Sequence, residues 1–599
     1  MTSNLALNMG SLRDLYRSGQ AKPCDVVAAL FDRIGSAPPD PVWISLVPRE
    51  AAIARARALG REPMATARPL YGMPFAIKDN IDWAGLPTTA GCPGYAYSPA
   101  RTATVVEALE GAGAILIGKT NLDQFATGLV GTRSPYGACS SVFDARYISG
   151  GSSSGSAVAV ASELVTFALG TDTAGSGRVP AAFNNLVGLK PTRGLLSTLG
   201  VVPACRTLDC VSILASTCHD AHTVWQAASG FDAGDPFSRA ATPGQGAGPW
   251  LGGPFRFGVP AEDHLEFFGD DEASGLYQKA LDAIRRLGGQ KVEIDFSSFR
   301  AAADLLYSGP WVAERLAAIR PFLDTQPDQM NPTVREIISG ARRFTAVEAF
   351  EAEYRLREIR RATEVLWERM DVLVLPTTGT IYTHEQVAAD PIRLNTNLGY
   401  YTNFVNLLDL AAVAAPAGFR STGLPFGISF IGPAFSDESL LALADHYHRV
   451  QADRPGPGVD FGSVPPECVA LAVVGAHLTG EPLHWQLTDR GARLIKTCRT
   501  GPGYRLYALE ATMPPKPGLV RDDSFEGPGI EVEVWAVPED QFGGFVAAVP
   551  APLGIGNATL ENGEVVKSFI CEPYAVRASQ EITQFGGWRA YLAQGVPVK

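Results

Sequence analysis

The chain has 599 residues, of which 46% are hydrophobic and 19% charged, the composition of an ordinary globular protein. Typical domains span roughly 100–200 residues, so we expect at least two of them. The formal net charge of −12, from 50 basic and 62 acidic side chains, excludes proteins that bind nucleic acid or anionic lipid through a broad basic surface.

The sequence shows no export or membrane signal. Its first residues lack a basic start followed by an apolar stretch and a small-residue cleavage site. The most apolar runs, residues 157–169 and 407–419, contain acidic residues and fall short of the ~20 residues that a membrane helix needs. The nine cysteines form neither a CxxC pair nor a zinc-binding pattern with histidines. We therefore expect a cytoplasmic protein with reduced thiols and with no cofactor, metal, nucleic acid or membrane partner.

The first part of the chain predicts helices followed by a layered sheet. Apolar residues between 12 and 34 follow helical periodicity, and the alanine-rich segment 51–59 predicts another helix. Between residues 70 and 220 short apolar runs alternate with helix-like segments, which favours an α/β sheet. Residues 230–256 are dense in glycine and proline and predict a long surface loop.

The middle of the chain is expected to be helical before it returns to strands. Residues 271–370 have a mainly helical pattern, whereas residues 371–378 and 424–435 have strand character. A helix is predicted over residues 437–449. Residues 454–466 then contain four prolines and three glycines, the composition of an interdomain linker.

We therefore predict a catalytic domain over residues 1–455, a Pro/Gly-rich linker over 456–467 and a smaller C-terminal domain over 468–599. The last of these contains short apolar segments joined by turns, which predicts a small α/β or mostly β domain. No internal repeat is evident in the sequence.

Two glycine-rich serine segments contain the most informative residues. Ser152 lies in SGGSSSGSA (149–157), and Ser176 follows 24 residues later in GTDTAGSGR (170–178). Neither segment has the GxxxxGK[ST] or GxGxxG pattern of a phosphate-binding loop. A flexible turn is the simplest interpretation of one such loop alone. Upstream, however, Lys78 ends the apolar run GMPFAIK, where burial would lower its pKa and leave a neutral amine that can act as a base.

Together these segments resemble the amidase-signature family of Ser-cisSer-Lys hydrolases. The resemblance covers about residues 10–450 and rests on five blocks in the family's order, which are GMPFAIKDN (72–80), TNLDQFATG (120–128), SGGSSSGSA, GTDTAGSGR and GLKPTRG (188–194). It implies an α/β fold in which helices flank a mixed central sheet. None of the eight histidines lies in these blocks, which argues against a Ser-His-Asp hydrolase.

The resemblance assigns roles to the matching residues. Ser176 matches the nucleophile, Ser152 the serine after a cis peptide bond and Lys78 the base, so that Ser152 relays a proton between Ser176 and Lys78. The backbone amides of Thr173, Ala174, Gly175 and Ser176 are expected to bind the oxyanion. Asp172 and Arg178 are interpreted as braces of this loop rather than as acid catalysts.

Other features are similar to the allophanate hydrolases within this family. The chain has Ala-Gly-Ser-Gly-Arg at residues 174–178 where the family usually has Gly-Gly-Ser-Ile-Arg, and it has an additional C-terminal domain. Tyr307 and Arg315 are eight residues apart, so in one helix both side chains share a face and can bind a carboxylate. Gly128 completes the substrate-binding residues that the resemblance implies. Core packing for Tyr307 and a surface charge for Arg315 are the alternative interpretation.

The resemblance implies hydrolysis of allophanate to ammonia and N-carboxycarbamate, which decomposes to carbon dioxide and a second ammonia. In the C-terminal domain His477, in VGAHLTG, is a possible acid/base group or a structural residue. The resemblance also implies a homodimer and a functional link to urea carboxylase. A general small-molecule amidase, a glutamine-hydrolysing subunit of a tRNA amidotransferase and an inactive scaffold remain alternatives.

Overall fold

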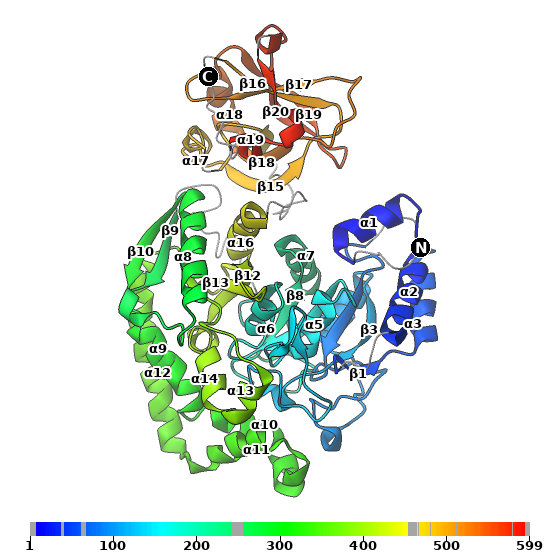
Figure 1. Ribbon diagram of the computed structural model, residues 1–599, viewed down its shortest axis with the longest axis vertical. Helices are drawn as coiled ribbons and strands as arrows, with labels where there is room; N and C mark the ends of the chain where they lie inside the picture. The colour runs from blue at the N-terminus through cyan, green and yellow to red at the C-terminus, as the bar shows by residue number, and fades with distance from the viewer. Residues whose placement is uncertain are drawn as a thin grey trace. The chain divides into compact units, whose positions relative to one another are not determined.

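The computed structural model describes residues 7–36, 41–61, 68–240, 255–452, 464, 467–479, 481–510, 512–577 and 579–592. The chain divides into two compact units. The first consists mainly of residues 1–247 and 291–444, and the second mainly of residues 445–599. Each unit has sheets of its own (Figure 1).

A mixed sheet of eleven strands, counted over the described residues, forms the centre of the first unit. The spatial order is β1 (Trp43–Leu46), β3 (Ile115–Thr120), β2 (Pro74–Lys78), β6 (Phe167–Asp172), β8 (Cys210–Ala215), β7 (Val187–Lys190), β12 (Leu410–Phe419), β13 (Pro425–Pro433), β11 (Val372–Pro376), β9 (Phe255–Pro260) and β10 (Gly289–Ile294). Strand β2 pairs in parallel with both β3 and β6, whereas β6 pairs antiparallel with β8. Every residue of β2, β3, β6 and β8 is buried, which explains why these strands are continuous apolar runs.

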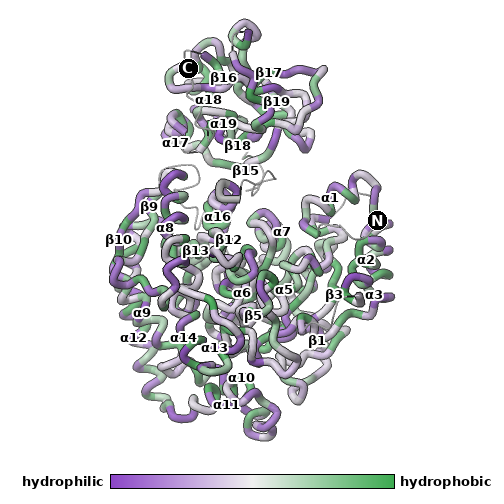
Figure 2. Tube along the Cα trace, in the orientation of Figure 1, coloured by the Kyte–Doolittle hydropathy of each residue, from purple (hydrophilic) through white to green (hydrophobic). Residues whose placement is uncertain are grey.

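Sixteen described helices lie before the second domain. They are α1 (Met9–Arg17), α2 (Pro23–Ser36), α3 (Arg49–Leu59), α4 (Thr104–Gly111), α5 (Ser154–Ala161), α6 (Arg178–Phe183), α7 (Cys218–Ala228), α8 (Asp271–Arg286), α9 (Ser297–Tyr307), α10 (Val312–Thr325), α11 (Pro332–Ser339), α12 (Ala346–Trp367), α13 (His384–Ala389), α14 (Arg393–Leu398), α15 (Phe404–Leu407) and α16 (Asp437–Ala452). Among them α3, α5, α6, α7 and α15 contact the strands of this sheet. Helix α5 packs on β2, β3 and β6, and its residues 154–160 are all buried. The outer helix α8 instead carries many hydrophilic residues (Figure 2).

The structure confirms the α/β class and the mixed central sheet with flanking helices. It corrects one detail of the predicted helical region, because β10 lies between α8 and α9. Four of the six β10 residues are not fully buried, as befits the last strand of a sheet, so the strand lacks the long apolar run that would have predicted it. Of the predicted surface loop, residues 241–254 lie outside the described residues.

The second unit is a smaller α/β domain. One sheet has the order β15 (Arg493–Arg499), β18 (Glu531–Pro538), β14 (Cys468–Val473), β20 (Val565–Cys571) and β19 (Leu553–Thr559), and a second has β17 (Pro517–Arg521), β16 (Tyr504–Ala508) and β21 (Gln580–Glu581). Helices α17 (Trp485–Thr488), α18 (Glu539–Ala547) and α19 (Trp588–Leu592) accompany them. Trp535 and Trp588 are almost fully buried in its apolar core.

Most of the predicted linker 456–467 lies outside the described residues. Among the helices that the structure describes, none combines the length and the apolar character needed to cross a bilayer.

Candidate active site

The sheet topology brings the segment that contains Lys78 close to the segment that contains Ser176. Strands β2 and β6 are parallel neighbours, so their carboxyl ends lie at the same edge of the sheet. Lys78 is the last residue of β2, and Ser176 follows the end of β6 by four residues. Ser152 shortly precedes α5, which packs on both strands. The backbone N–H of Ser153 donates to the carbonyl of Ser176 at 3.3 Å, which joins the two serine loops.

Lys78 is a buried amine with two hydroxyl partners. Its side chain has no exposed surface, and Nζ lies 2.8 Å from Ser152 Oγ and 2.8 Å from Thr171 Oγ1. Burial lowers the pKa of Lys78 to about 7, although Asp123 and Asp172 oppose the shift. A substantial fraction of Lys78 is therefore neutral near pH 7 and can accept a proton from Ser152.

The peptide bond between Gly151 and Ser152 is cis, as the family pattern led us to expect. Gly151 has no room for a side chain, because a Cβ there would overlap Asp123 Oδ2 and lie 2.5 Å from the Gly131 nitrogen. Asp123 in turn accepts the backbone N–H groups of Gly131 and Arg133, each at 2.9 Å. Glycine at position 151 thus lets two loops approach closely beside Ser152.

Ser176 faces the loop that follows β3. Its hydroxyl donates to the Gly128 carbonyl at 3.4 Å, and the residue is 2% exposed. The predicted nucleophile and the predicted substrate-binding residue Gly128 are therefore neighbours. In this structure the Ser176 hydroxyl donates a hydrogen bond to the Gly128 carbonyl, and Ser152 Oγ accepts one from Lys78 Nζ.

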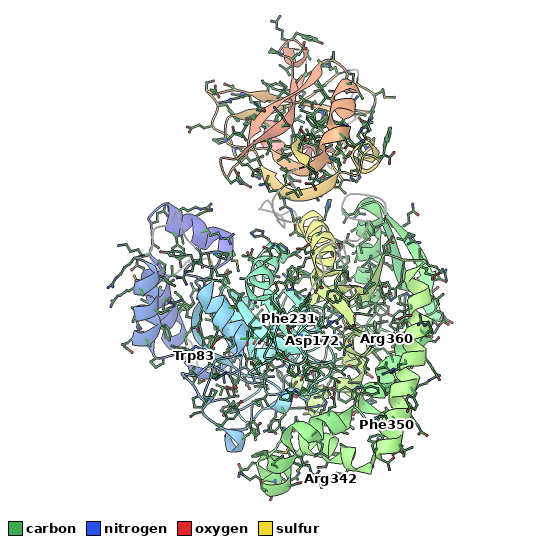
Figure 3. The ribbon with its side chains drawn as sticks, turned by 180° about the vertical axis from the view of Figure 1, so that it is seen from behind. Trp83, Asp172, Phe231, Arg342, Phe350 and Arg360 are labelled. Carbon is green, nitrogen blue, oxygen red and sulfur yellow. The ribbon has the colours of Figure 1, made fainter. Side chains whose placement is uncertain are left out.

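Asp172 and Arg178 brace the nucleophile loop, as predicted. The Asp172 carboxylate accepts the Gly175 N–H at 2.8 Å and the Gly177 N–H at 3.1 Å, and it pairs with Arg178 at 2.9 Å. Arg178 holds the pKa of Asp172 below its usual value against the opposing effect of burial. Asp172 lies inside the first unit, in contrast to the exposed Phe350 on α12 (Figure 3).

This bracing changes the expected oxyanion site. Because the Gly175 N–H donates to Asp172, it is not free to bind an oxyanion. We therefore no longer count Gly175 among the expected oxyanion donors. The backbone N–H groups of Thr173, Ala174 and Ser176 have no acceptor among the described residues. These three amides, at the carboxyl end of β6, are the available donors beside Ser176.

Tyr307 and Arg315 meet, but not on one helix. Tyr307 is the last residue of α9 and Arg315 lies in α10, because Gly309 and Pro310 interrupt the helical pattern between them. Arg315 Nη2 nevertheless lies 3.4 Å from the Tyr307 hydroxyl, and the guanidinium is 5.4 Å from the tyrosine ring centre.

The Arg315 guanidinium is buried next to the serine site. It is 2% exposed, and its Nη1 donates to the Ala126 carbonyl at 3.2 Å and to Thr127 Oγ1 at 3.0 Å, directly before Gly128. Its Nε has no hydrogen-bond partner among the described residues. Buried donors are rarely left unpaired, so this N–H is a candidate contact for a bound ligand.

The sequence interpretation missed Thr171 and Thr127. Thr171 Oγ1 contacts both Lys78 Nζ and, at 3.3 Å, Asn80 Nδ2, and Thr127 accepts from Arg315. Both threonines lie inside the motif blocks that were quoted. The hydrogen bond between Thr171 and Lys78 joins residues 93 positions apart, and one sequence does not show which distant side chains meet.

His477 lies in the apolar core of the second unit. It is 8% exposed, its ring stacks on Phe569 with centres 4.8 Å apart, and its Nε2 lies 2.9 Å from Gln486 Oε1. Burial lowers the pKa of His477 to about 4, so the imidazole is neutral near pH 7.

Comparison with known proteins agrees with this arrangement. Residues 25–441 match the family model described as Amidase, and residues 469–593 match the allophanate hydrolase C-terminal domain. The chain is 45% identical to urea amidolyase of Saccharomyces cerevisiae over 97% of its own length, but it spans only 33% of that relative. It is 32% identical to a glutamyl-tRNA(Gln) amidotransferase subunit of Symbiobacterium thermophilum, over 74% of this chain and 96% of that one.

A solved structure extends over both units. The Kluyveromyces lactis allophanate hydrolase is 44% identical, with a TM-score of 0.73 over 97% of this chain and 98% of that chain. The match continues from the amidase region into the C-terminal region, which a simple amidase lacks. The chain therefore belongs to the amidase family, and it combines the amidase domain with a C-terminal domain of the allophanate hydrolase type.

Proposed function

We propose that this chain hydrolyses allophanate through Lys78, Ser152 and Ser176. The observation that carries the proposal is the buried Arg315, whose Nε has no partner among the described residues and whose other nitrogens contact Tyr307 and the segment before Gly128. A buried cation beside a serine nucleophile suits a small amide that bears a carboxylate. The likeness to allophanate hydrolase and urea amidolyase supports this substrate.

The carboxylate of allophanate would bind Arg315 and the Tyr307 hydroxyl. Burial lowers the pKa of Arg315, but nearby groups that include the Asp209 and Glu314 carboxylates raise it above its ordinary value, so the guanidinium is charged. An incoming carboxylate neutralises this charge and satisfies Nε. The terminal amide then reaches Ser176, and its N–H groups can donate to the Gly128 carbonyl that Ser176 contacts in the free enzyme.

Acylation would begin with attack of Ser176 Oγ on the terminal amide carbon. The Ser176 proton moves to Ser152 Oγ while the Ser152 proton moves to neutral Lys78 Nζ. The amides of Thr173, Ala174 and Ser176 stabilise the negative oxygen of the tetrahedral intermediate. The C–N bond then breaks, the relay returns a proton to the leaving nitrogen, and ammonia departs from the acyl-enzyme.

Deacylation would repeat this chemistry with water as the nucleophile. Lys78, through Ser152, removes a proton from the water, which attacks the acyl carbon and frees Ser176. The product is N-carboxycarbamate, and its decomposition gives a second ammonia and two molecules of carbon dioxide. We further propose that His477 assists this later step, with the neutral imidazole and the apolar ring contacts of the second unit favouring loss of carbon dioxide.

The remaining proposals concern domain limits, partners and cellular location. We propose the domain limits 1–455 and 468–599; the two matched regions, 25–441 and 469–593, support them, although the compact units divide after residue 444. A functional link to urea carboxylase is supported by the longer urea amidolyases, of which this chain spans about a third. The homodimer and the cytoplasmic location remain predictions. The nine cysteines are free thiols in this structure, which is compatible with a reducing compartment.

The first test measures ammonia release by the purified chain from allophanate, malonamate, glutamine and an aryl amide. Rapid release from allophanate that Ser176→Ala abolishes would support the proposal. Arg315→Ala should raise KM for allophanate and leave an uncharged aryl amide almost unaffected. Preference for the aryl amide would favour a general amidase, and preference for glutamine would favour a component of an amidotransferase.

A further inference from the structure

Asp209 is a buried carboxylate that the proposed reaction does not use. It is 7% exposed and lies one residue before β8. Oδ1 accepts the Thr173 hydroxyl and, at 3.2 Å, the Cys205 N–H, while Oδ2 accepts the Ala204 N–H at 2.8 Å. Such complete pairing of a buried carboxylate indicates that its orientation is fixed.

The Thr173 hydroxyl connects Asp209 to the expected oxyanion site. Thr173 is the first residue after β6, and its own N–H and that of Ala174 are two of the three available donors beside Ser176. Asp172 already holds the later residues of this loop through the amides of Gly175 and Gly177. Asp209 holds its first residue, Thr173, so that two carboxylates orient one short loop.

The segment that ends in Asp209 also reaches the helix that contains Arg315. Cys205 Sγ donates to the Trp311 carbonyl at 3.6 Å, and the Thr207 hydroxyl donates to Glu314 Oε2 at 2.7 Å. Glu314 directly precedes Arg315 in α10. Segment 204–209 therefore bridges the helix of the proposed carboxylate site and the loop of the expected oxyanion site.

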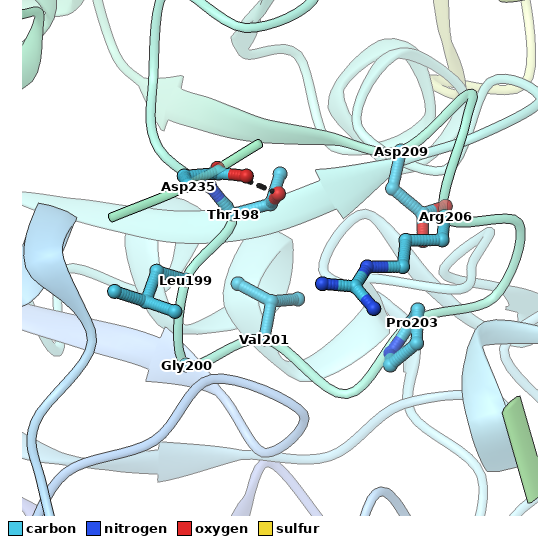
Figure 4. Close-up of a pocket in the computed structure, with 8 residues that line it drawn as sticks. All are labelled: Thr198, Leu199, Gly200, Val201, Pro203, Arg206, Asp209 and Asp235. Carbon is cyan, nitrogen blue, oxygen red and sulfur yellow. Dashed lines mark hydrogen bonds between the residues drawn. The ribbon is translucent and has the colours of Figure 1, made fainter. Parts of the chain in front are cut away.

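Cys205 and Leu208 of this segment belong to the same buried apolar cluster as Ala174, whereas Arg206 and Asp209 face a pocket. Arg206 and Asp209 line a pocket of about 250 Å³ together with residues of the 198–203 loop (Figure 4). Side chains that face a pocket have fewer neighbours to restrain them. Two backbone N–H groups therefore restrain the Asp209 carboxylate, which in turn accepts the Thr173 hydroxyl.

We infer that Asp209 is a positioning residue, which orients Thr173 so that the amides of Thr173 and Ala174 face the developing oxyanion. The inference rests on the proposed serine mechanism at Ser176, but it does not depend on which amide is the substrate. Because these amides bind charge that develops only in the transition state, the contact should affect kcat much more than KM.

Thr173→Val removes the hydroxyl while it keeps the shape of the side chain. We expect kcat to fall roughly 10–100-fold with KM changed by less than about twofold, a smaller effect than the roughly 10²–10³-fold cost of deleting an oxyanion donor. Thr173→Ser retains the hydroxyl and should keep most of the wild-type kcat. An unchanged kcat in Thr173→Val, or an equal loss in Thr173→Ser, would overturn the inference.

Asp209→Asn tests the other partner of the contact. If the two residues act through one hydrogen bond, the double variant Thr173→Val/Asp209→Asn should be little slower than the slower single variant. Fully multiplicative losses would mean that Asp209 acts independently of Thr173. Because Asp209→Asn also weakens the pairing of two amides, its melting temperature is measured beside its kinetics, and Thr173→Val remains decisive if that variant fails to fold.

The assay separates failure of this inference from failure of the proposed function. Each variant is measured with allophanate and with the amide that the wild type hydrolyses fastest. If allophanate is not the substrate, the kcat of each variant relative to wild type can still be measured with the second amide. A second readout is the rate of inactivation by a fluorophosphonate, whose phosphoryl oxygen occupies an oxyanion site when a serine attacks. Thr173→Val should slow this reaction about as much as it slows kcat, and Thr173→Ser should not.

Discussion

At the scale of single residues, the environment of Lys78 determines whether it can act as the proposed base. A lysine in water is protonated at neutral pH and cannot serve as a base. Here the carboxyl end of β2 is buried, and the hydrogen-bond partners of Nζ among the described residues are the hydroxyls of Ser152 and Thr171. Hydroxyls solvate an amine without adding a neighbouring negative charge, so the neutral form is accessible.

This environment predicts the dependence of activity on pH. The pKa of Lys78 is lowered to about 7, and the protonated form cannot accept the Ser152 proton. The value of kcat/KM should therefore rise with pH, with an apparent pKa of about 7, and level off above it. Stopped-flow or coupled ammonia assays across this range would check the profile. A rate that falls as pH rises through about 7 would contradict the role of Lys78.

The same shift has a consequence for stability. In the unfolded chain Lys78 regains its ordinary pKa of 10.5, so between about 7 and 10.5 the unfolded state binds more protons than the folded state. The contribution of Lys78 to the free energy of unfolding should therefore increase with pH over this window. The difference between wild type and Lys78→Met, measured by chemical denaturation at several pH values, isolates this contribution.

Thr171 should orient Lys78. Its Oγ1 accepts one N–H of the amine, which leaves the lone pair directed at Ser152. Thr171→Val should lower kcat/KM by about 10–100-fold, since a buried donor without its acceptor costs about 1–3 kcal/mol. Thr171→Ser keeps the hydroxyl and is the matched control. Equal activity of the Val and Ser variants would exclude this role.

At the scale of elements, the site depends on loops that approach closely. The loop before α5 passes Asp123 and Gly131 with no space for a side chain at position 151. Helices α9 and α10 contribute one residue each to the proposed carboxylate site, and the break between them allows the two side chains to converge. The strands supply a rigid edge, and short connections carry the reacting groups.

Gly151→Ala tests this close approach. The added Cβ overlaps Asp123 and the Gly131 backbone, so we expect a loss of stability of about 1–3 kcal/mol or more and a nearly complete loss of activity. Gly275→Ala is the control, because this glycine lies inside α8 with no atom within 4 Å of an added Cβ. It should be neutral or stabilise by up to about 1 kcal/mol. Thermal denaturation and ammonia release measure both variants.

At the scale of the whole molecule, the two proposed reaction steps are assigned to different units. The residues proposed for amide hydrolysis all belong to the first unit, and His477 belongs to the second. Hydrolysis of the amide and decomposition of its product are therefore separable by substitution. Each unit has its own buried core, which is what separate domains require.

His477→Gln should leave the first ammonia release unchanged and allow N-carboxycarbamate to accumulate. Carbon-13 NMR of labelled allophanate under alkaline conditions, where carbamates decompose slowly, would detect this product. His484→Gln is the control in the same unit, because His484 is also buried and lies against Trp535. Identical product ratios for wild type and both variants would leave His477 a structural residue.

Much of this protein was predictable from local patterns. Helix 51–59, strands β2 and β3, and the α/β class follow from periodicity and from buried apolar runs, which depend on near neighbours in the chain. The motif blocks around Lys78, Ser152 and Ser176 were identifiable because close backbone approach demands glycine at fixed positions and the proposed chemistry demands serine and lysine.

Contacts between distant segments were not predictable in this way. The ends of the neighbouring strands β2 and β6 bring Thr171 to Lys78, the turn between α9 and α10 brings Arg315 to Tyr307, and the Gly175 amide donates to Asp172. Each of these contacts depends on the relative orientation of two segments, which is set only when the sheets and helices pack. The residue types present in the site follow from the order of the amino acids, whereas the partner of each side chain follows from the packing of segments far apart in the chain.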